Sequence, residues 1–217
     1  MMKSFIKTLI RLLPINLQNS IRRRILESRN KALIREWQET GSPLPPPHQV
    51  KQKAIREYAE KYHVGTLVET GTFMGDMVEA QRRNFKEIFS IELSPELWNN
   101  AIKRFKTAPE VKILQGNSGV VLHQIMAGMD SPALFWLDGH FSAGMTARGD
   151  KDCPIYEELE AIFSYSKQDH IILVDDARLF VGVGDYPTIE ALTDYIQKKD
   201  PRYQIQIKDD IIRATVK

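Results

Sequence analysis

Short apolar runs alternate with longer segments of helical spacing over most of the chain. The runs hold about five apolar residues each, which is typical of strands that are buried on both faces. The longer segments repeat apolar residues at helical intervals. The predicted strands are 65–69, 87–92, 111–115, 133–138, 170–175, 203–207 and 211–216, and the predicted helices are 48–63, 77–84, 94–106, 119–126, 155–166 and 188–198. This alternation predicts an α/β fold, a mostly parallel sheet with helices on both faces.

The first forty residues follow a different pattern. Residues 1–40 contain nine basic residues (Lys and Arg) and three acidic ones, whereas residues 41–217 contain 21 basic and 25 acidic residues. One amphipathic helix is predicted near the start and a second over 17–39, so we interpret 1–40 as a basic amphipathic helical arm. Charges and Pro14 interrupt its first apolar run, unlike a transmembrane span or a signal peptide.

Two roles are open for this arm. A basic amphipathic helix can rest on anionic lipid, which would make the protein peripheral to a membrane. Alternatively, the helices pack on the rest of the chain or on a second subunit of a homodimer, with their basic side chains in water. We favour packing on protein, because short amphipathic helices usually find a protein partner.

Length and composition restrict the domain organisation, the class of protein and the partners that can be expected. The 217 residues suit one α/β domain with an extension, and we assign 41–47 as a Pro-rich linker and 48–217 as the domain. Apolar residues make up 42% and charged residues 27%, which excludes a wholly disordered chain. A single cysteine, Cys153, excludes a disulfide framework and fits a cytoplasmic location. A formal charge of +2 gives no overall attraction to nucleic acid, so no such partner is expected.

Polar side chains stand where the predicted strands end. In open parallel sheets, ligands bind beyond the carboxyl ends of the strands. Acids close four of the strands, where they would meet in one cleft and need a cation or a polyhydroxyl ligand to be tolerated. The residues at the strand ends are Glu69, Glu92, Asn117, Asp138, Asp175 and Asp176.

The first candidate site is the turn after strand 65–69. Gly71 lets the chain turn sharply, Gly75 lets the next helix approach closely, and the backbone N–H groups between them can face a ligand. Glu92 follows Glu69 by 23 positions, where a carboxylate can accept both ribose hydroxyls of an adenosine. Phe73 stands in place of the middle glycine of the dinucleotide fingerprint, which argues against NAD. These features predict a nucleoside site; a tight turn with a surface glutamate is the alternative.

The segment Glu69-x-Gly-Thr-Phe-x-Gly75 resembles the first motif of the class I S-adenosylmethionine-dependent methyltransferases, in particular of their small-molecule O-methyltransferases. The resemblance runs over about residues 48–217 and implies a Rossmann-like methyltransferase fold with S-adenosylmethionine (SAM) as cofactor. It implies that the methionine part of SAM lies on Glu69 and the turn residues, the ribose on the end of strand 87–92, and the adenine beside 115–118. The implied cofactor residues are Glu69, Gly71, Thr72, Phe73, Gly75, Glu92, Leu93, Asn117, Ser118 and Asp138. Asn-Ser is equally an ordinary cap for the helix that follows.

The second candidate site comprises Asp138, Asp175 and Asp176. Three carboxylates in one cleft repel each other unless a divalent cation joins them, and hard oxygen ligands favour Mg²⁺ or Mn²⁺ over Zn²⁺. This is similar to the metal-dependent branch of the family, including catechol and macrolide-sugar O-methyltransferases, whose strand-end acids bind Mg²⁺. The resemblance implies a metal that chelates a substrate hydroxyl and lowers its pKa. Alternatively, Asp175 and Asp176 cap a loop or pair with Arg178 and Arg148.

Two residues at and just after the end of strand 133–138 are the catalytic candidates. His140 is a candidate general base near neutral pH, with a structural role as the alternative. Asp138 faces either the metal or the sulfonium or ammonium end of SAM. Residues 141–154 form a polar connection that is long for its place, and we interpret it as a lid or acceptor-binding loop. Cys153 is expected to be a packed residue rather than a nucleophile.

The function predicted from these features is transfer of a methyl group from SAM to a hydroxyl oxygen of a small molecule or a sugar. The enzyme would be of a bacterial type, would lie in the cytoplasm and would use a divalent metal. One alternative is a metal-dependent hydrolase or phosphoryl-transfer enzyme that uses the three aspartates and does not need Glu92. The other is a non-catalytic nucleoside-binding module tethered by its arm.

Overall fold

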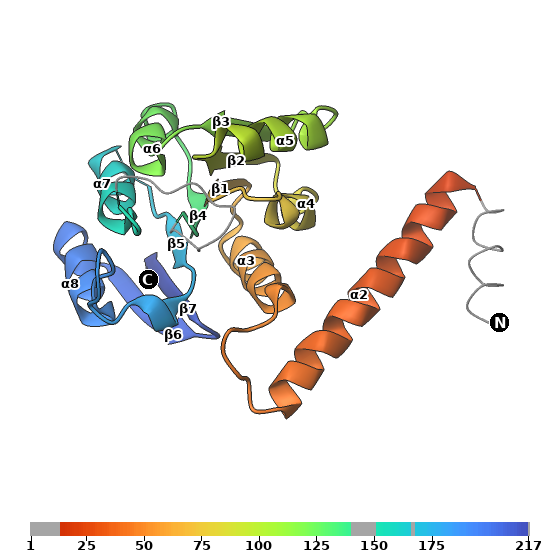
Figure 1. Ribbon diagram of the computed structural model, residues 1–217, viewed down its shortest axis with the longest axis horizontal. Helices are drawn as coiled ribbons and strands as arrows, with labels where there is room; N and C mark the ends of the chain where they lie inside the picture. The colour runs from red at the N-terminus through yellow and green to blue at the C-terminus, as the bar shows by residue number, and fades with distance from the viewer. Residues whose placement is uncertain (1–13, 140–150, 166–167, 217) are drawn as a thin grey trace. The chain divides into compact units, whose positions relative to one another are not determined.

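The computed structural model of the protein describes residues 14–139, 151–165 and 168–216, and Figure 1 shows its elements. The chain divides into two compact units, Met1–Val50 and Lys51–Lys217. The predictions for the first helix of the arm, for His140 and for most of the connection that follows it lie outside the described residues.

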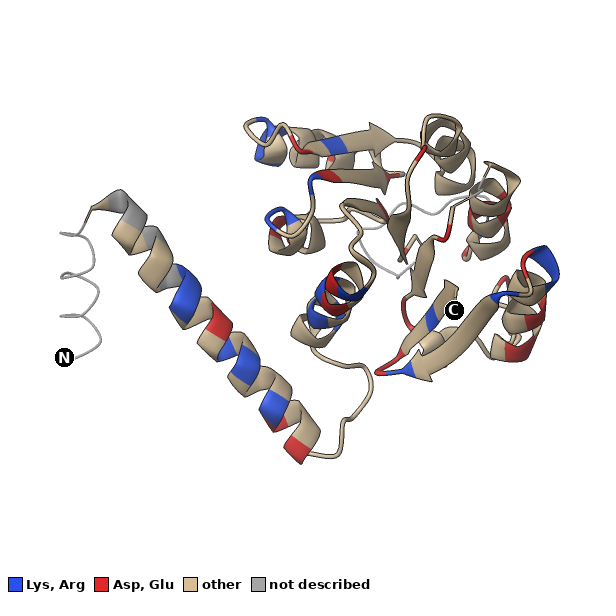
Figure 2. Cartoon of the chain, turned by 180° about the vertical axis from the view of Figure 1, so that it is seen from behind, with Lys and Arg blue, Asp and Glu red and all other residues tan. Residues whose placement is uncertain are grey.

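The first unit contains a long helix, α2 (Ile15–Glu39), along which Lys and Arg recur (Figure 2). The helix ends where Gly41 takes a left-handed φ of 86°. The N–H of Gly41 donates to the Gln38 carbonyl and that of Ser42 to the Trp37 carbonyl, at 3.1 and 2.9 Å, as in a Schellman cap. In the described residues no helix has the length and apolar character to cross a membrane. The exposed apolar side chains of α2 are Leu17, Ile25, Leu26 and Leu33.

The second unit is built on one sheet. Within the described residues it has seven strands in the order β3-β2-β1-β4-β5-β7-β6. The first five pair in parallel, and β7 runs antiparallel to both β5 and β6. All predicted strands are confirmed to within one residue at each end. The strands are β1 (Thr66–Thr70), β2 (Glu87–Glu92), β3 (Val111–Gln115), β4 (Ala133–Leu137), β5 (Ile171–Val174), β6 (Tyr203–Lys208) and β7 (Ile211–Val216).

Helices cover both faces of this sheet, as predicted (Figure 1). Successive residues of a strand point to opposite faces, so Leu134 and Trp136 of β4 join one core and Phe135 and Leu137 join the other. The first core also receives α3, α4 and α5, and the second receives α6, α7 and α8. The helices are α3 (His48–Tyr62), α4 (Asp76–Gln81), α5 (Pro95–Phe105), α6 (Ser118–Ala127), α7 (Ile155–Tyr165) and α8 (Ile189–Lys199).

Two local features differ from the sequence-based expectation. Helix α4 was expected to reach residue 84 but ends at Gln81. A short 3₁₀ helix, η1 (Ala177–Leu179), follows β5 and was not predicted. The division of the chain into an arm, a linker at 41–47 and a domain from 48 stays a prediction.

Candidate functional site

The strand order reverses between β1 and β4, where the candidate site lies. From β1 the chain adds β2 and β3 on one side and then returns to place β4 on the other. The register puts Thr70 level with Ile91 and Leu137, so the three strands end along one edge. Reversals of this kind are where open α/β sheets bind their ligands. The predicted residues of the first site are therefore brought to one place.

The turn after β1 can be made only with glycine at its two ends. Gly71 has a φ of 83°, and a Cβ atom on it would lie 2.4 Å from the Asp138 carbonyl oxygen. Gly75 has a φ of 78°, and a Cβ atom there would lie 2.7 Å from the Phe105 ring. Phe73 is also left-handed, at 48°, a conformation that costs a bulky residue free energy. The sharp turn predicted at Gly71 and close packing at Gly75 are observed, whereas the contact of both residues with a cofactor stays a prediction.

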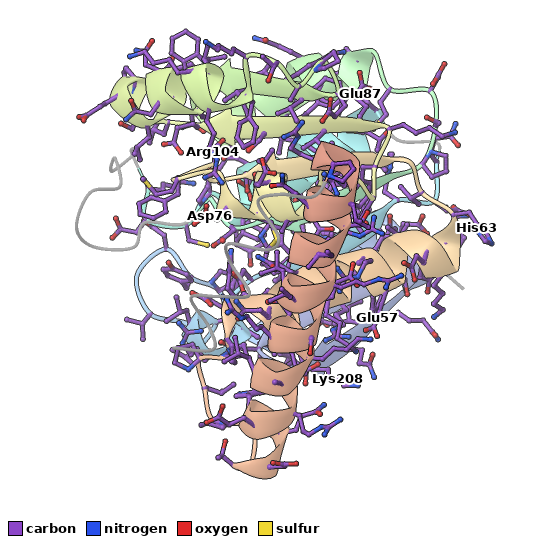
Figure 3. The ribbon with its side chains drawn as sticks, turned by 90° about the vertical axis from the view of Figure 1, so that its right-hand side faces the viewer. Glu57, His63, Asp76, Glu87, Arg104 and Lys208 are labelled. Carbon is purple, nitrogen blue, oxygen red and sulfur yellow. The ribbon has the colours of Figure 1, made fainter. Side chains whose placement is uncertain are left out.

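An arginine of α5 holds the same turn from outside. Arg104 Nη1 donates to the carbonyl oxygen of Met74 and to Asp76 Oδ1, the latter at 2.7 Å. Figure 3 labels both Arg104 and Asp76. The side chains of Phe73 and Met74 remain 44% and 48% exposed, so the turn presents apolar surface beside its backbone N–H groups.

Glu92 ties the turn to the end of β2. Its side chain is buried, with Oε2 accepting the Phe73 N–H at 2.7 Å and Oε1 accepting the Ser94 N–H at 2.8 Å. A carboxylate has about four lone-pair positions, so each oxygen retains capacity for another donor. The structure thus gives Glu92 a positioning role that the sequence did not reveal. Its contact with a ribose stays a prediction.

Glu69 is buried at the centre of the same edge. The Ser90 hydroxyl donates to Glu69 Oε2 at 2.5 Å, and Thr72 Oγ1 lies 2.6 Å from Ser90 Oγ. Since the single Ser90 proton points to Glu69, Thr72 donates to Ser90. Burial raises the pKa of Glu69 to about 8, Ser90 opposes that rise and the Glu92 charge adds to it. Glu69 and Glu92, named here the glutamate pair, therefore share one buried region.

The end of β3 shows the capping alternative for Asn117. Asn117 Oδ1 accepts the Gly119 N–H at 3.0 Å and caps α6. Ser118 donates to Glu158 Oε1 at 2.6 Å, and both side chains are buried. Sequence reasoning missed Glu158, because it lies forty positions from Ser118 on another helix. Contact of Asn117 and Ser118 with an adenine stays a prediction.

The structure does not group Asp138, Asp175 and Asp176 as a metal site. In the described residues no set of three His, Cys, Asp or Glu is arranged to hold a metal ion. Instead, Lys51 of α3 places its Nζ 2.6 Å from Asp175 Oδ2 and 2.8 Å from Asp176 Oδ1. Arg178 Nη1 lies 2.7 Å from Asp176 Oδ1, as the alternative interpretation expected. We name Asp175 and Asp176 the aspartate pair.

The charges around the aspartate pair shift one another. Burial raises the pKa of Asp175 to about 6, Lys51 opposes the rise and Asp176 adds to it. Burial lowers the pKa of Lys51, but the two aspartates outweigh it and the pKa lies above its ordinary value. Burial raises the pKa of Asp138 well above its ordinary value, and the charges of both Asp175 and Glu69 add to that rise. Asp138 thus lies within electrostatic reach of both acid pairs.

Cys153 is buried, and burial raises the pKa of its thiol to about 12. A thiol with so high a pKa is inert at neutral pH, which confirms the expectation of a packed residue. At the described end of the predicted lid, Lys151 pairs with Glu157, and the Asp152 N–H donates to Asp185 at 2.7 Å. The remainder of that loop, with Arg148, lies outside the described residues.

Solved structures share this architecture over most of the chain. An O-methyltransferase from Bacillus cereus in complex with SAH aligns with a TM-score of 0.56 at 16% identity, covering 88% of this chain and 91% of its own. The fold is that of the Rossmann-like methyltransferases. The SAH-bound methyltransferase PaMTH1 of Podospora anserina has a TM-score of 0.54 at 18% identity, with 95% and 98% covered. TomG of Streptomyces achromogenes is an O-methyltransferase involved in tomaymycin synthesis and was solved in complex with SAM. It aligns with a TM-score of 0.53 at 15% identity, covering 86% of this chain and 88% of its own. No protein-family model and no curated protein sequence matches the chain.

Proposed function

We propose that the protein transfers a methyl group from SAM to a hydroxyl oxygen of a small-molecule or sugar acceptor. The observation that carries the proposal is the glutamate pair, buried at the ends of neighbouring strands beside a turn that only glycines can form. This arrangement stands at the reversal of strand order in a methyltransferase fold. Similar structures with SAM or SAH bound, two of them O-methyltransferases by name, support the same reading.

The residues present fit such a donor. SAM, when bound, supplies an activated methyl group on a positively charged sulfonium. Among the described residues, hydroxyl and backbone N–H groups rather than cations donate to the glutamate pair. Burial raises the pKa of Glu69 to about 8, and a cationic ligand beside it would favour its charged form. In this proposal Glu69 faces the ammonium, Glu92 accepts the ribose hydroxyls, and Asn117 and Ser118 lie beside the adenine. Asp138 completes the cofactor side.

The acceptor side of the proposal rests on fewer contacts. Methyl transfer to oxygen is an in-line displacement, so the site must align the hydroxyl with the donor and exclude water. His140 stays the proposed base. A metal at Asp138, Asp175 and Asp176 is not carried into the proposal, because Lys51 lies between the last two. The cytoplasmic location, the homodimer and the membrane contact of the arm stay predictions.

Calorimetric titration with SAM tests the proposal. Wild-type protein is expected to bind SAM, and Glu92→Ala is expected to lose binding because the turn loses its anchor and the ribose its acceptor. Glu87→Ala is the matched control. Glu87 lies at the amino-terminal end of the same strand, away from the candidate site, and pairs there with Lys112. Glu87 is labelled in Figure 3. This control should bind as the wild type does.

Product analysis separates the competing functions. Mass spectrometry of reactions with SAM and a panel of polyols, phenols and catechols should show a methylated product. Binding of SAM without any product from the panel would favour a nucleoside-binding module. Hydrolysis of phosphoesters that survives Glu92→Ala, without SAM binding, would favour the hydrolase and end the methyltransferase proposal.

A further inference from the structure

The aspartate pair has no carboxylate oxygen without a donor. Asp175 Oδ1 accepts the Asp176 N–H at 2.8 Å, and Asp175 Oδ2 accepts Lys51 Nζ. Asp176 Oδ1 accepts both Lys51 and Arg178, and its Oδ2 accepts Arg178 Nη2 at 3.2 Å. A divalent cation bound here would have to displace at least one of these donors.

The position of the Lys51 ammonium is the one that a shared cation would take. Mg²⁺ lies about 2.1 Å from its oxygen ligands, so an ion bridging Asp175 Oδ2 and Asp176 Oδ1 would collide with Nζ at 2.6 and 2.8 Å. The repulsion would be strong, because the side chains of Lys51, Asp175 and Asp176 are only 13%, 2% and 14% exposed. Lys51 and Arg178 bring two positive charges to the aspartate pair, and Arg178 also pairs with the buried Asp210.

Helix α3 explains how a lysine reaches the strand ends. Ala54, Ile55 and Ala59 lie three, four and eight positions after Lys51 and are buried in the core under α3. Residues at these intervals share one face of a helix, so Lys51 lies on the face that turns toward the sheet. Lys53, two positions on, is instead 44% exposed and pairs with Glu57 at 2.5 Å.

We propose that Lys51 is a positioning residue whose ammonium replaces a divalent metal at the aspartate pair, so that the protein works without Mg²⁺ or Mn²⁺ at this position. Its connection to methyl transfer rests on the proposed function; the statement about metal binding does not. Lys51 and Arg178 would then hold the loop after β5 in place through the aspartate pair.

Titration with Mn²⁺ followed by electron paramagnetic resonance tests the replacement. Full-length protein is first treated with a chelator and desalted. Wild type and Lys53→Ala are expected to bind no Mn²⁺ at the aspartate pair and therefore to leave the signal of free Mn²⁺ unchanged. Lys51→Ala should gain a site that quenches the signal, and Asp175→Asn introduced into Lys51→Ala should remove it again.

Several outcomes would overturn the replacement. Wild-type binding of Mn²⁺ that Asp175→Asn abolishes would show that the metal and the lysine coexist. A folded Lys51→Ala variant, verified by circular dichroism, that gains no Mn²⁺ site would show that Lys51 does not stand in a cation position. If Lys51→Ala does not fold, the wild-type titration with its Asp175→Asn control decides the question by itself.

The same preparations distinguish this inference from the proposed function. If chelator-treated wild type binds SAM by calorimetry and yet binds Mn²⁺ at Asp175, the lysine replacement fails and the methyltransferase proposal stands. If it binds no Mn²⁺ at the aspartate pair and no SAM, the methyltransferase proposal fails and the lysine replacement stands. With an acceptor identified, chelator treatment should change the wild-type rate less than twofold.

Discussion

The two acid pairs at the carboxyl edge of the sheet are stabilised in opposite ways. The glutamate pair accepts hydrogen bonds from neutral groups, namely the Ser90 hydroxyl and two backbone N–H groups. The aspartate pair accepts from two cations, Lys51 and Arg178. Neutral donors bring no positive charge to an acid, whereas ammonium and guanidinium groups do. An acid at a strand end is therefore a candidate for a cationic ligand only where the chain itself provides no cation.

The largest expected effect comes from removing the cation of the aspartate pair. Lys51→Ala leaves the buried Asp175 and the half-buried Asp176 short of a counter-charge, and we expect a loss of about 3–5 kcal/mol in the free energy of unfolding at pH 7. Lys53→Ala, whose ion pair is exposed, should change it by less than about 0.5 kcal/mol. Urea unfolding of the two variants measures the difference; equal losses would mean that the aspartate pair does not depend on Lys51.

A smaller effect is expected at the turn that serves the glutamate pair. Gly71→Ala would set a methyl group against the Asp138 carbonyl at a left-handed φ. We expect the free energy of unfolding to fall by about 2–4 kcal/mol and SAM binding to be lost. Gly184→Ala controls for backbone strain alone, since Gly184 has a φ of 61° with open space around it. It should cost about 1 kcal/mol. Thermal unfolding and calorimetry of both variants would show whether close approach, rather than conformation, makes Gly71 necessary.

The smallest effect, taken for each pH unit, is a pH dependence that belongs to the glutamate pair. Folded protein keeps the Glu69 proton up to about pH 8, whereas the unfolded chain releases it near the ordinary value of 4.5. The folded state then binds more protons between these values, so its stability falls as pH rises, by at most about 1.4 kcal/mol per unit. Glu69→Gln should remove this part of the slope between pH 6 and 8. Asp138 also has a raised pKa, so the difference between wild type and variant is the quantity to measure.

Sequence reasoning predicted the elements better than the contacts between them. Strand ends were correct to one residue because apolar runs and glycine turns are local signals. The pairing of Lys51 with Asp175 joins residues 124 positions apart, and no local pattern connects a helix before β1 with the end of β5. For Asn117 the sequence contained both interpretations, and the cap is the one observed. The sequence offered the pairing of Asp176 with Arg178 as an alternative, but it did not reveal the contribution of Lys51.

Strand β7 carries a consequence for how the molecule is made. It lies between β5 and β6 and contributes the buried side chains of Ile211, Ile212 and Ala214. During translation β5 therefore has an open edge until residues 211–216 have left the ribosome. An unpaired edge can pair with other chains, so docking of the β6–β7 hairpin closes a site of possible edge-to-edge association.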